Sequence, residues 1–223
     1  ISSIGDTTVV TDKWMLGTRN SFLIGISATL LATALGTVAA LGLSRPHMPF
    51  KGTIMAILIS PMIVPLIITA AGMFFFYSKV GLTHSYLGLI LAHTALGTPF
   101  VVITVTATLT GFDTNLIRAS QSLGADTFRT FFKVIMPLIL PGVISGGLFA
   151  FITSFDEVVV VMFVGSVEQI TIPKQMWAGL RQETSPVILC MATCLVALSI
   201  ALLTTVELLR RRSERLRGIK LRN

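Results

Sequence analysis

The chain has 223 residues, of which 53% are hydrophobic and only 12% are charged, and its mean hydropathy is +0.84. So few polar residues cannot cover a water-soluble globule of this size, which excludes a soluble protein and predicts an integral membrane protein. The formal net charge of +7 is interpreted as a topology signal, so nucleic-acid binding is not expected.

Five stretches of the chain are apolar and long enough to cross a bilayer as helices. None of them contains Asp, Glu, Lys or Arg, and about 20 helical residues cross a hydrocarbon core roughly 30 Å thick. These stretches are residues 21–44, 52–78, 80–111, 134–155 and 184–206. The alternating pattern of a barrel strand is absent from them, so we expect an all-α integral membrane protein with five spans in this sequence.

The basic residues predict the orientation of these helices. If residues 1–20 form an external loop, the segments 45–51, 113–133 and 210–223 lie inside the cell. These segments hold 12 of the 17 basic residues, namely Arg45, Lys51, Arg118, Arg129, Lys133, Arg210, Arg211, Arg212, Arg215, Arg217, Lys220 and Arg222. Because basic residues favour the cytoplasmic side, the tail at 210–223 is expected in the cytoplasm.

The start of the chain predicts a further helix. The sequence begins Ile-Ser-Ser, and an external start combined with a cytoplasmic tail requires an earlier passage across the membrane. We therefore expect six spans in the intact protein, the first of them preceding this sequence. A cleaved signal peptide followed by five spans is the alternative.

No catalytic or metal-binding constellation stands out in the sequence. Cys190 and Cys194 lie one helical turn apart with no His or other Cys near them, so we interpret them as packing residues. His93 lies inside a span, where a neutral imidazole bonded to a neighbouring helix is expected. The glycines at 142–147 indicate close helix packing rather than a phosphate-binding loop. Neither a metal nor a cofactor is expected in this chain.

A polar segment between the third and fourth spans is the most specific feature. Asp113 or Thr114 is expected to cap a short helix, and Gly124 suits the left-handed position that ends it. One face of that helix carries Leu116, Ala119, Ser120 and Leu123. A second helix is expected to start at Asp126, with an apolar stripe at Phe128, Phe131, Phe132 and Ile135. The segment is either a docking surface for a partner or an interfacial connector between two spans.

This segment resembles the EAA loop of binding-protein-dependent ABC transporter permeases. That loop reads Glu-Ala-Ala, three residues, Gly, nine residues, then Ile, any residue and Leu-Pro, and it forms the coupling helices that insert into the ATPase subunit. Here Arg118-Ala119-Ser120 is followed by Gly124 and Pro137 at the same spacing, with Val134 and Met136 as smaller departures. The resemblance assigns ATPase coupling to the loop at about 111–136 and to Arg118, Ala119, Ser120, Leu123, Gly124, Ala125, Phe128 and Pro137.

Arg118 is the main departure from the family pattern, because it replaces a glutamate. The reversed sign puts any particular ion pair to the ATPase in question. Docking itself is expected to rest on shape and apolar contact, and the partner surface is expected to be correspondingly more acidic.

The resemblance extends over nearly the whole chain and is strongest to the second permease of spermidine/putrescine-type importers. The matching features are Asn20-Ser21, the motif from Ser60-Pro61 to Pro65, Ala92-His93 before Pro99, Ser154-Phe155-Asp156-Glu157 and Thr171-Ile172-Pro173. It implies a single transmembrane domain over residues 1–223 with the fold of a type I ABC importer, working by alternating access in the bacterial inner membrane.

The resemblance also implies the partners and the substrate class. The partners are a homologous permease as heterodimer partner, a dimer of ATP-binding subunits that carries ATP and Mg, and an external solute-binding protein. A polyamine leads as substrate, with amino-acid derivatives such as 4-aminobutyrate or an opine as alternatives. An ATP-independent transporter or channel is the alternative of a different class.

The run Ser154, Phe155, Asp156 and Glu157 is a candidate for the translocation path or its outer gate. Its two carboxylates lie beside long apolar stretches, where facing lipid would be costly. They either attract a cationic solute by charge complementarity or accept backbone hydrogen bonds in a structural turn.

Overall fold

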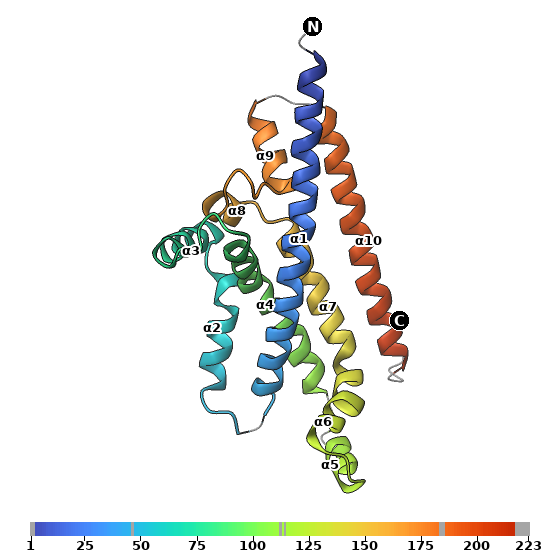
Figure 1. Cartoon of the computed structure of the whole chain (residues 1–223). Helices are drawn as coiled ribbons and strands as arrows, with labels where there is room; N and C mark the ends of the chain where they lie inside the picture. The colour runs from blue at the N-terminus through green and yellow to red at the C-terminus, as the bar shows by residue number, and fades with distance from the viewer. Residues whose placement is uncertain (1–2, 46, 112, 114, 183–185, 217–223) are drawn as a thin grey trace.

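The computed structural model describes residues 3–45, 47–111, 113, 115–182 and 186–216. All regular elements within these ranges are helices, as Figure 1 shows. They are α1 (Ser3–Leu43), α2 (Lys51–Ile63), α3 (Leu66–Val80), α4 (Tyr86–Thr110), α5 (Asn115–Ser122), α6 (Thr127–Thr130), the π-helical turn η1 (Phe131–Ile135), α7 (Met136–Phe155), α8 (Val159–Val164), α9 (Ile172–Gln182) and α10 (Pro186–Leu216). The expected all-α class is confirmed.

Four helical stretches among the described residues are long and apolar enough to cross a membrane: Asp12–Leu43, Tyr86–Thr110, Thr127–Phe155 and Ile188–Thr205. They include four of the five predicted spans. The fourth starts at Thr127 rather than at residue 134, because α6, η1 and α7 follow one another without a break.

The predicted second span, 52–78, is not one straight helix. It consists of α2 and α3, which meet at an angle of 104°, and the two make a fifth span only if they are counted together. The break lies at Val64, whose φ of −72° and ψ of 134° are extended, directly before Pro65. A proline disfavours the helical conformation of the residue before it, so the chain turns at this point.

Residues 3–20 are helical, so the expected external loop is wrong in conformation. They extend the first span toward the N-terminus as part of α1. Between residues 3 and 43 the sequence contains no proline and only isolated glycines. Nothing in this stretch therefore forces the helix to stop.

The helices α1, α4 and α7 form the core of the bundle. Its buried residues are small or β-branched for the most part, namely Ala32, Ala40, Val101, Val105, Ile139, Val143 and Ala150. At Gly146 on α7, an added Cβ would lie 2.8 Å from the Cα of Val101 on α4. This close approach of the two backbones confirms the packing interpretation of the glycines at 142–147.

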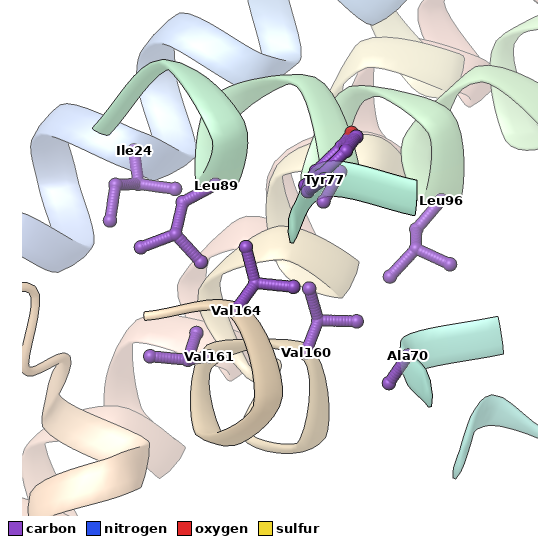
Figure 2. Packing of buried hydrophobic residues seen from close by; sticks show 9 residues of the cluster. Ile24, Ala70, Tyr77, Leu89, Leu96, Val160, Val161 and Val164 are labelled. Carbon is purple, nitrogen blue, oxygen red and sulfur yellow. The ribbon is translucent and has the colours of Figure 1, made fainter. Parts of the chain in front are cut away.

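A second cluster joins α3, α4 and α8 (Figure 2). In it Val160, Val161 and Val164 of α8 lie beside Leu89 of α4 and Ala70 of α3, and all five are buried. The short helix α8 therefore anchors the bent pair α2–α3 to the bundle.

Candidate functional site

The polar segment at residues 111–136, called here the α5–α6 loop, projects from one end of the bundle (Figure 1). Its first helix is capped as expected. The Oδ1 atom of Asp113 accepts a hydrogen bond from the N–H of Asn115 at 2.9 Å. The alternative cap, Thr114, lies outside the described residues.

Gly124 ends α5 in the left-handed conformation, with φ of +81°. The N–H of Gly124 donates to the carbonyl of Gln121 at 2.9 Å, and the N–H of Ala125 donates to the carbonyl of Ser120 at 3.0 Å. These two bonds form a Schellman motif, which satisfies carbonyl groups at the end of a helix. The predicted helix end is therefore confirmed.

Asp126 starts the second helix, also as predicted. Its Oδ1 accepts from the N–H of Arg129 at 2.8 Å, so it is the N-cap of α6. The hydroxyl oxygens of Ser120 and Thr130 lie 3.0 Å apart in a hydrogen bond, and Thr130 is buried. This bond joins α5 to α6 and fixes the angle of the loop.

One side of the loop faces the bundle across a cavity of about 360 Å³. Ile117 and Gln121 line the cavity from α5, while Leu41 of α1 and Leu109 of α4 line it from the bundle. The contact between the loop and the bundle is therefore incompletely packed, because the cavity separates part of the two surfaces.

The other side of the loop exposes apolar and basic residues. The side chain of Leu123 is 89% exposed and that of Phe128 is 71% exposed. Arg118 and Ala119 are exposed as well, whereas Ser120 and Ala125 are half-buried. Large exposed apolar side chains beside a charge are typical of a surface that another protein covers.

The predicted aromatic stripe divides at η1. The rings of Phe128 and Phe132 lie 4.6 Å apart between centroids and remain exposed. Phe131 and Ile135 instead line the cavity. A π-helical turn changes the register of a helix, so residues of one ideal stripe point in two directions. Pro137 lies after the π-helical turn, in the first turn of α7, and is exposed.

Ser154 and Phe155, two of the four candidates for the translocation path, are packed inside the bundle. The Oγ of Ser154 lies 2.8 Å from the Nδ1 of His93, and both residues are buried. This hydrogen bond joins α7 to α4, so the expected bond of His93 to a neighbouring helix is confirmed. The ring of Phe155 packs against Phe22 of α1 and Phe151, with centroids 5.1 and 5.2 Å away.

The two carboxylates that follow have different surroundings. Asp156 is exposed at the C-terminal end of α7. Glu157 is only 7% exposed, and its Oε1 accepts from the N–H of Val160 at 2.9 Å, at the start of α8. Burial raises the pKa of Glu157, against the opposing effect of backbone hydrogen bonds to its carboxylate. Glu157 thus has the geometry of the structural cap, and Asp156 is the carboxylate that faces outward.

The end of the bundle opposite the α5–α6 loop contains a polar network that sequence reasoning did not find. The side-chain amide of Asn20 is buried and donates to the carbonyls of Glu168 and Ile170 at 2.8 and 2.9 Å. The hydroxyl of Tyr86 donates to the Oδ1 of Asn20 at 3.0 Å. The hydroxyl of Ser21 accepts from the N–H of Ile172 at 2.9 Å. The only signal in the sequence was the pair Asn20-Ser21 beside an apolar run.

The part of the chain that the structure describes contains no group of three or more His, Cys, Asp or Glu residues placed to hold a metal ion. Cys190 and Cys194 are both exposed on α10 and unpaired. Their thiols therefore point away from the packed core, which corrects the expectation that they are packing residues within this chain.

Comparison with known proteins identifies the family. Residues 32–215 match the family described as binding-protein-dependent transport system inner membrane component. The spermidine/putrescine transport system permease protein PotC of Haemophilus influenzae is 32% identical over 194 residues, which cover 87% of this chain and 76% of that protein. The putrescine transport system permease protein PotI of Escherichia coli K12 is 29% identical over 195 residues, covering 83% and 68% of the two chains.

A solved structure confirms the fold. In an inward-facing conformation of the MetNI methionine ABC transporter, one chain superposes with a TM-score of 0.66 at 20% identity, covering 93% of this chain and 95% of that one. The fold is thus that of a type I ABC importer transmembrane domain. From the matched family and these similarities, the chain belongs to the binding-protein-dependent transport system inner membrane components, the permeases of ABC importers.

Proposed function

We propose that this permease carries a polyamine across the bacterial inner membrane, driven by ATP hydrolysis on a partner chain. The relatives named above belong to spermidine/putrescine and putrescine transport systems, which supports a small cationic solute. In this proposal residues 1–223 form one transmembrane domain that pairs with a homologous permease. An external solute-binding protein delivers the substrate, and the tail at 210–223 lies in the cytoplasm.

The exposed apolar surface of the α5–α6 loop is the observation that carries the coupling part of the proposal. Leu123, 89% exposed at the tip, gains nothing from its own chain. Burying a leucine side chain against a partner contributes about 2 kcal/mol. The Schellman turn at Gly124 and the cap at Asp126 hold the tip in one conformation. A rigid tip can pass the movement of an ATP-binding subunit to α7 through α6 and η1, which follow one another without a break.

Asp156 is the residue that we assign to the route of a cationic solute. It is exposed, whereas the neighbouring Glu157 is buried and engaged with the N–H of Val160. An exposed carboxylate attracts a cation over distances of about 8 Å at physiological salt. Ser154 and Phe155 then support the position of Asp156 through their contacts with α4 and α1.

Purification of the native complex through a tag on this chain tests the transport function. An ATP-binding subunit should co-purify, and liposomes containing the complex and its solute-binding protein should take up labelled putrescine or spermidine only with ATP. Uptake without ATP would instead indicate a secondary transporter or a channel. Uptake of 4-aminobutyrate in place of both polyamines would show that the substrate class is wrong.

The coupling role has a separate test with a matched control. Leu123→Ser should weaken co-purification of the ATP-binding subunit about tenfold or more, because the apolar contact is lost. Val167→Ser changes an equally apolar side chain that is 80% exposed near the opposite end of the bundle. It should leave this co-purification unchanged. Equal effects of the two substitutions would refute the assignment of the α5–α6 loop to ATPase coupling.

For the solute route, Asp156→Asn should raise the apparent KM for spermidine several-fold while the complex still assembles. Glu157→Gln, which keeps a hydrogen-bond acceptor at the buried position, should leave that KM unchanged. An unchanged KM for Asp156→Asn would remove Asp156 from the route.

A further inference from the structure

The geometry points to a carboxylate on the ATP-binding subunit as the partner of Arg118: we propose that the surface which receives the α5–α6 loop is acidic where it faces α5. The inference rests on the proposed function, because it takes the partner of the loop to be an ATP-binding subunit. It adds the chemistry of the contact, which an exposed apolar tip alone does not determine.

Among the described residues of the loop, none bonds the guanidinium of Arg118. Its side chain is exposed on α5, and the bond from the Ser122 hydroxyl, at 3.0 Å, goes to its backbone carbonyl. Two carboxylates lie in the same loop, at Asp113 and Asp126. Each has an oxygen engaged by a backbone N–H group that starts a helix, at 2.9 and 2.8 Å. Each therefore helps to hold the loop together through its Oδ1, and neither is bonded to Arg118 among the described residues.

The orientation of α5 separates Arg118 from the contact that closes the loop. Ser120, which bonds Thr130 of α6, lies two residues after Arg118 and thus about 200° around the helix. The guanidinium therefore points away from α6. Ala119, Ser122 and Leu123, which follow it around the helix, are exposed as well. Arg118 consequently belongs to the side of the loop that is free to meet another protein.

The loop as a whole is also basic. Residues 113–133 contain Arg118, Arg129 and Lys133 against Asp113 and Asp126, which gives a formal charge of +1. Arg129 and Lys133 are both exposed. An acidic partner surface would therefore attract the loop before contact as well as bind it afterwards.

Docking of the exposed side of α5, where Ser122 lies one helical turn after Arg118, would bring Arg118 out of water. A charge that is buried without a partner strongly destabilises an interface, so the guanidinium requires an acceptor. A carboxylate fits the planar fork of an arginine through two parallel hydrogen bonds, which gives both strength and geometry. Backbone carbonyls at a helix end are the competing acceptor, and they cannot form an amide with an amine.

This difference allows a direct chemical test in the purified complex. The Arg118→Lys variant places a primary amine at the same position. After a water-soluble carbodiimide activates a carboxylate, attack by this amine releases the urea and leaves an amide between the two chains. Mass spectrometry of the digested complex should identify a cross-linked peptide joining position 118 to an Asp or Glu of the ATP-binding subunit.

Val167→Lys is the control, since Val167 is 80% exposed near the opposite end of the bundle. It should form no amide with the ATP-binding subunit. The proposal is overturned if the intact complex of the Arg118→Lys variant yields no such amide, or if Val167→Lys yields it equally.

Charge substitutions provide an independent measurement of the same contact. Arg118→Glu should weaken binding of the ATP-binding subunit at least about tenfold, and Arg118→Gln should weaken it less, because only the former adds repulsion. Binding of Arg118→Glu as tight as that of the unaltered permease would contradict an acidic partner. If the unaltered permease retains no ATP-binding subunit at all, the proposed function fails, and this result is distinct from a failure confined to position 118.

Discussion

The bundle of α1, α4 and α7 and the α5–α6 loop are held in place by different kinds of contact. In the bundle, Gly146 lets two backbones approach closely, and Asn20 bonds a carbonyl 148 residues away along the chain. In the loop, most hydrogen bonds join residues two to five positions apart, and the bond between Ser120 and Thr130 spans only ten.

This difference indicates how each region is held in its conformation. The bundle buries small residues between its own helices and bonds several of its buried polar groups internally, although the Nε2 of His93 and the hydroxyl of Thr37 have no partner among the described residues. The loop has a well-defined backbone but leaves Leu123 and Phe128 in solvent. Substitutions in the bundle should therefore lower stability, whereas substitutions in the loop should lower coupling while the bundle remains folded.

The largest effect is expected at the contact between α4 and α7. Gly146→Val places side-chain atoms where the Cα of Val101 lies 2.8 Å from an added Cβ, and neither backbone can move without disturbing the bundle. We expect a loss of about 3 kcal/mol of stability. Size-exclusion chromatography after heating the detergent-solubilised permease measures this loss. Gly72→Val is the control, because an added Cβ there has no neighbour within 4 Å. Equal losses from both would show that the close approach is not limiting.

The next effect is expected at the opposite end from the loop. Asn20→Ala removes the amide that bonds Glu168 and Ile170 and leaves their carbonyls and the Tyr86 hydroxyl with fewer partners. The cost should be about 2 kcal/mol, measured in the same heating experiment. Thr18→Ala removes a hydroxyl that bonds the carbonyl of Trp14 in its own helix, so it should be nearly neutral. A neutral Asn20→Ala would mean that the polar network does not stabilise this end.

A substitution in the loop should have a smaller and differently placed effect. Gly124→Ala puts a Cβ on a residue with φ of +81° and should cost about 1–2 kcal/mol, confined to the turn. ATP hydrolysis stimulated by the loaded solute-binding protein should fall, while the heat stability of the bundle stays unchanged. Gly111→Ala, at an ordinary φ of −91°, is the control. If Gly124→Ala unfolds the permease, the loop and the bundle are not independent in stability, and the contrast drawn between them is wrong.

The smallest effect concerns the buried carboxylate at the start of α8. Glu157→Ala removes the acceptor for the N–H of Val160 and should cost about 1 kcal/mol, whereas Glu157→Gln keeps an acceptor and should cost less. Because the pKa of Glu157 is raised by burial, the folded state holds its proton more strongly than the unfolded state does. Stability from this group should therefore increase as the pH falls through the raised pKa of Glu157 toward the ordinary pKa of a glutamate. Heating the permease at each pH measures this trend. If the trend is absent in the Glu157→Gln variant, it is assigned to Glu157.

Local features of the loop were predictable because short-range geometry determines them. Gly124 is the residue type that adopts a left-handed conformation most easily, and an aspartate at position 126 is a strong N-cap. Both predictions required only the neighbouring residues. The division of the aromatic stripe was not predictable, because the π-helical turn at Phe131–Ile135 leaves no clear mark in the sequence.

Features that depend on distant partners were missed or only half predicted. Asp156 and Glu157 are adjacent in sequence, and only the packing of α8 shows that one is exposed and the other buried. Residues 52–78 were predicted as one span, whereas Pro65 separates α2 from α3 and Pro61 lies inside α2 without ending it. The two helices meet at 104°, and α3 packs against α8, a contact between segments far apart in the sequence.

The amino-acid sequence alone determined that this is an all-α membrane protein, where most of its apolar helices lie, and that the loop from Gly124 to Pro137 has the spacing of a permease coupling segment. The length of each apolar stretch and the residue types at each turn contain that information, because both depend on residues close together in the sequence. The tertiary structure alone decided which polar residues are buried in the bundle, as for Asn20 and Ser154, and which remain exposed, as for Arg118 and Asp156. The burial of a residue depends on helices from distant parts of the chain that pack against it. A short stretch of sequence therefore does not predict it.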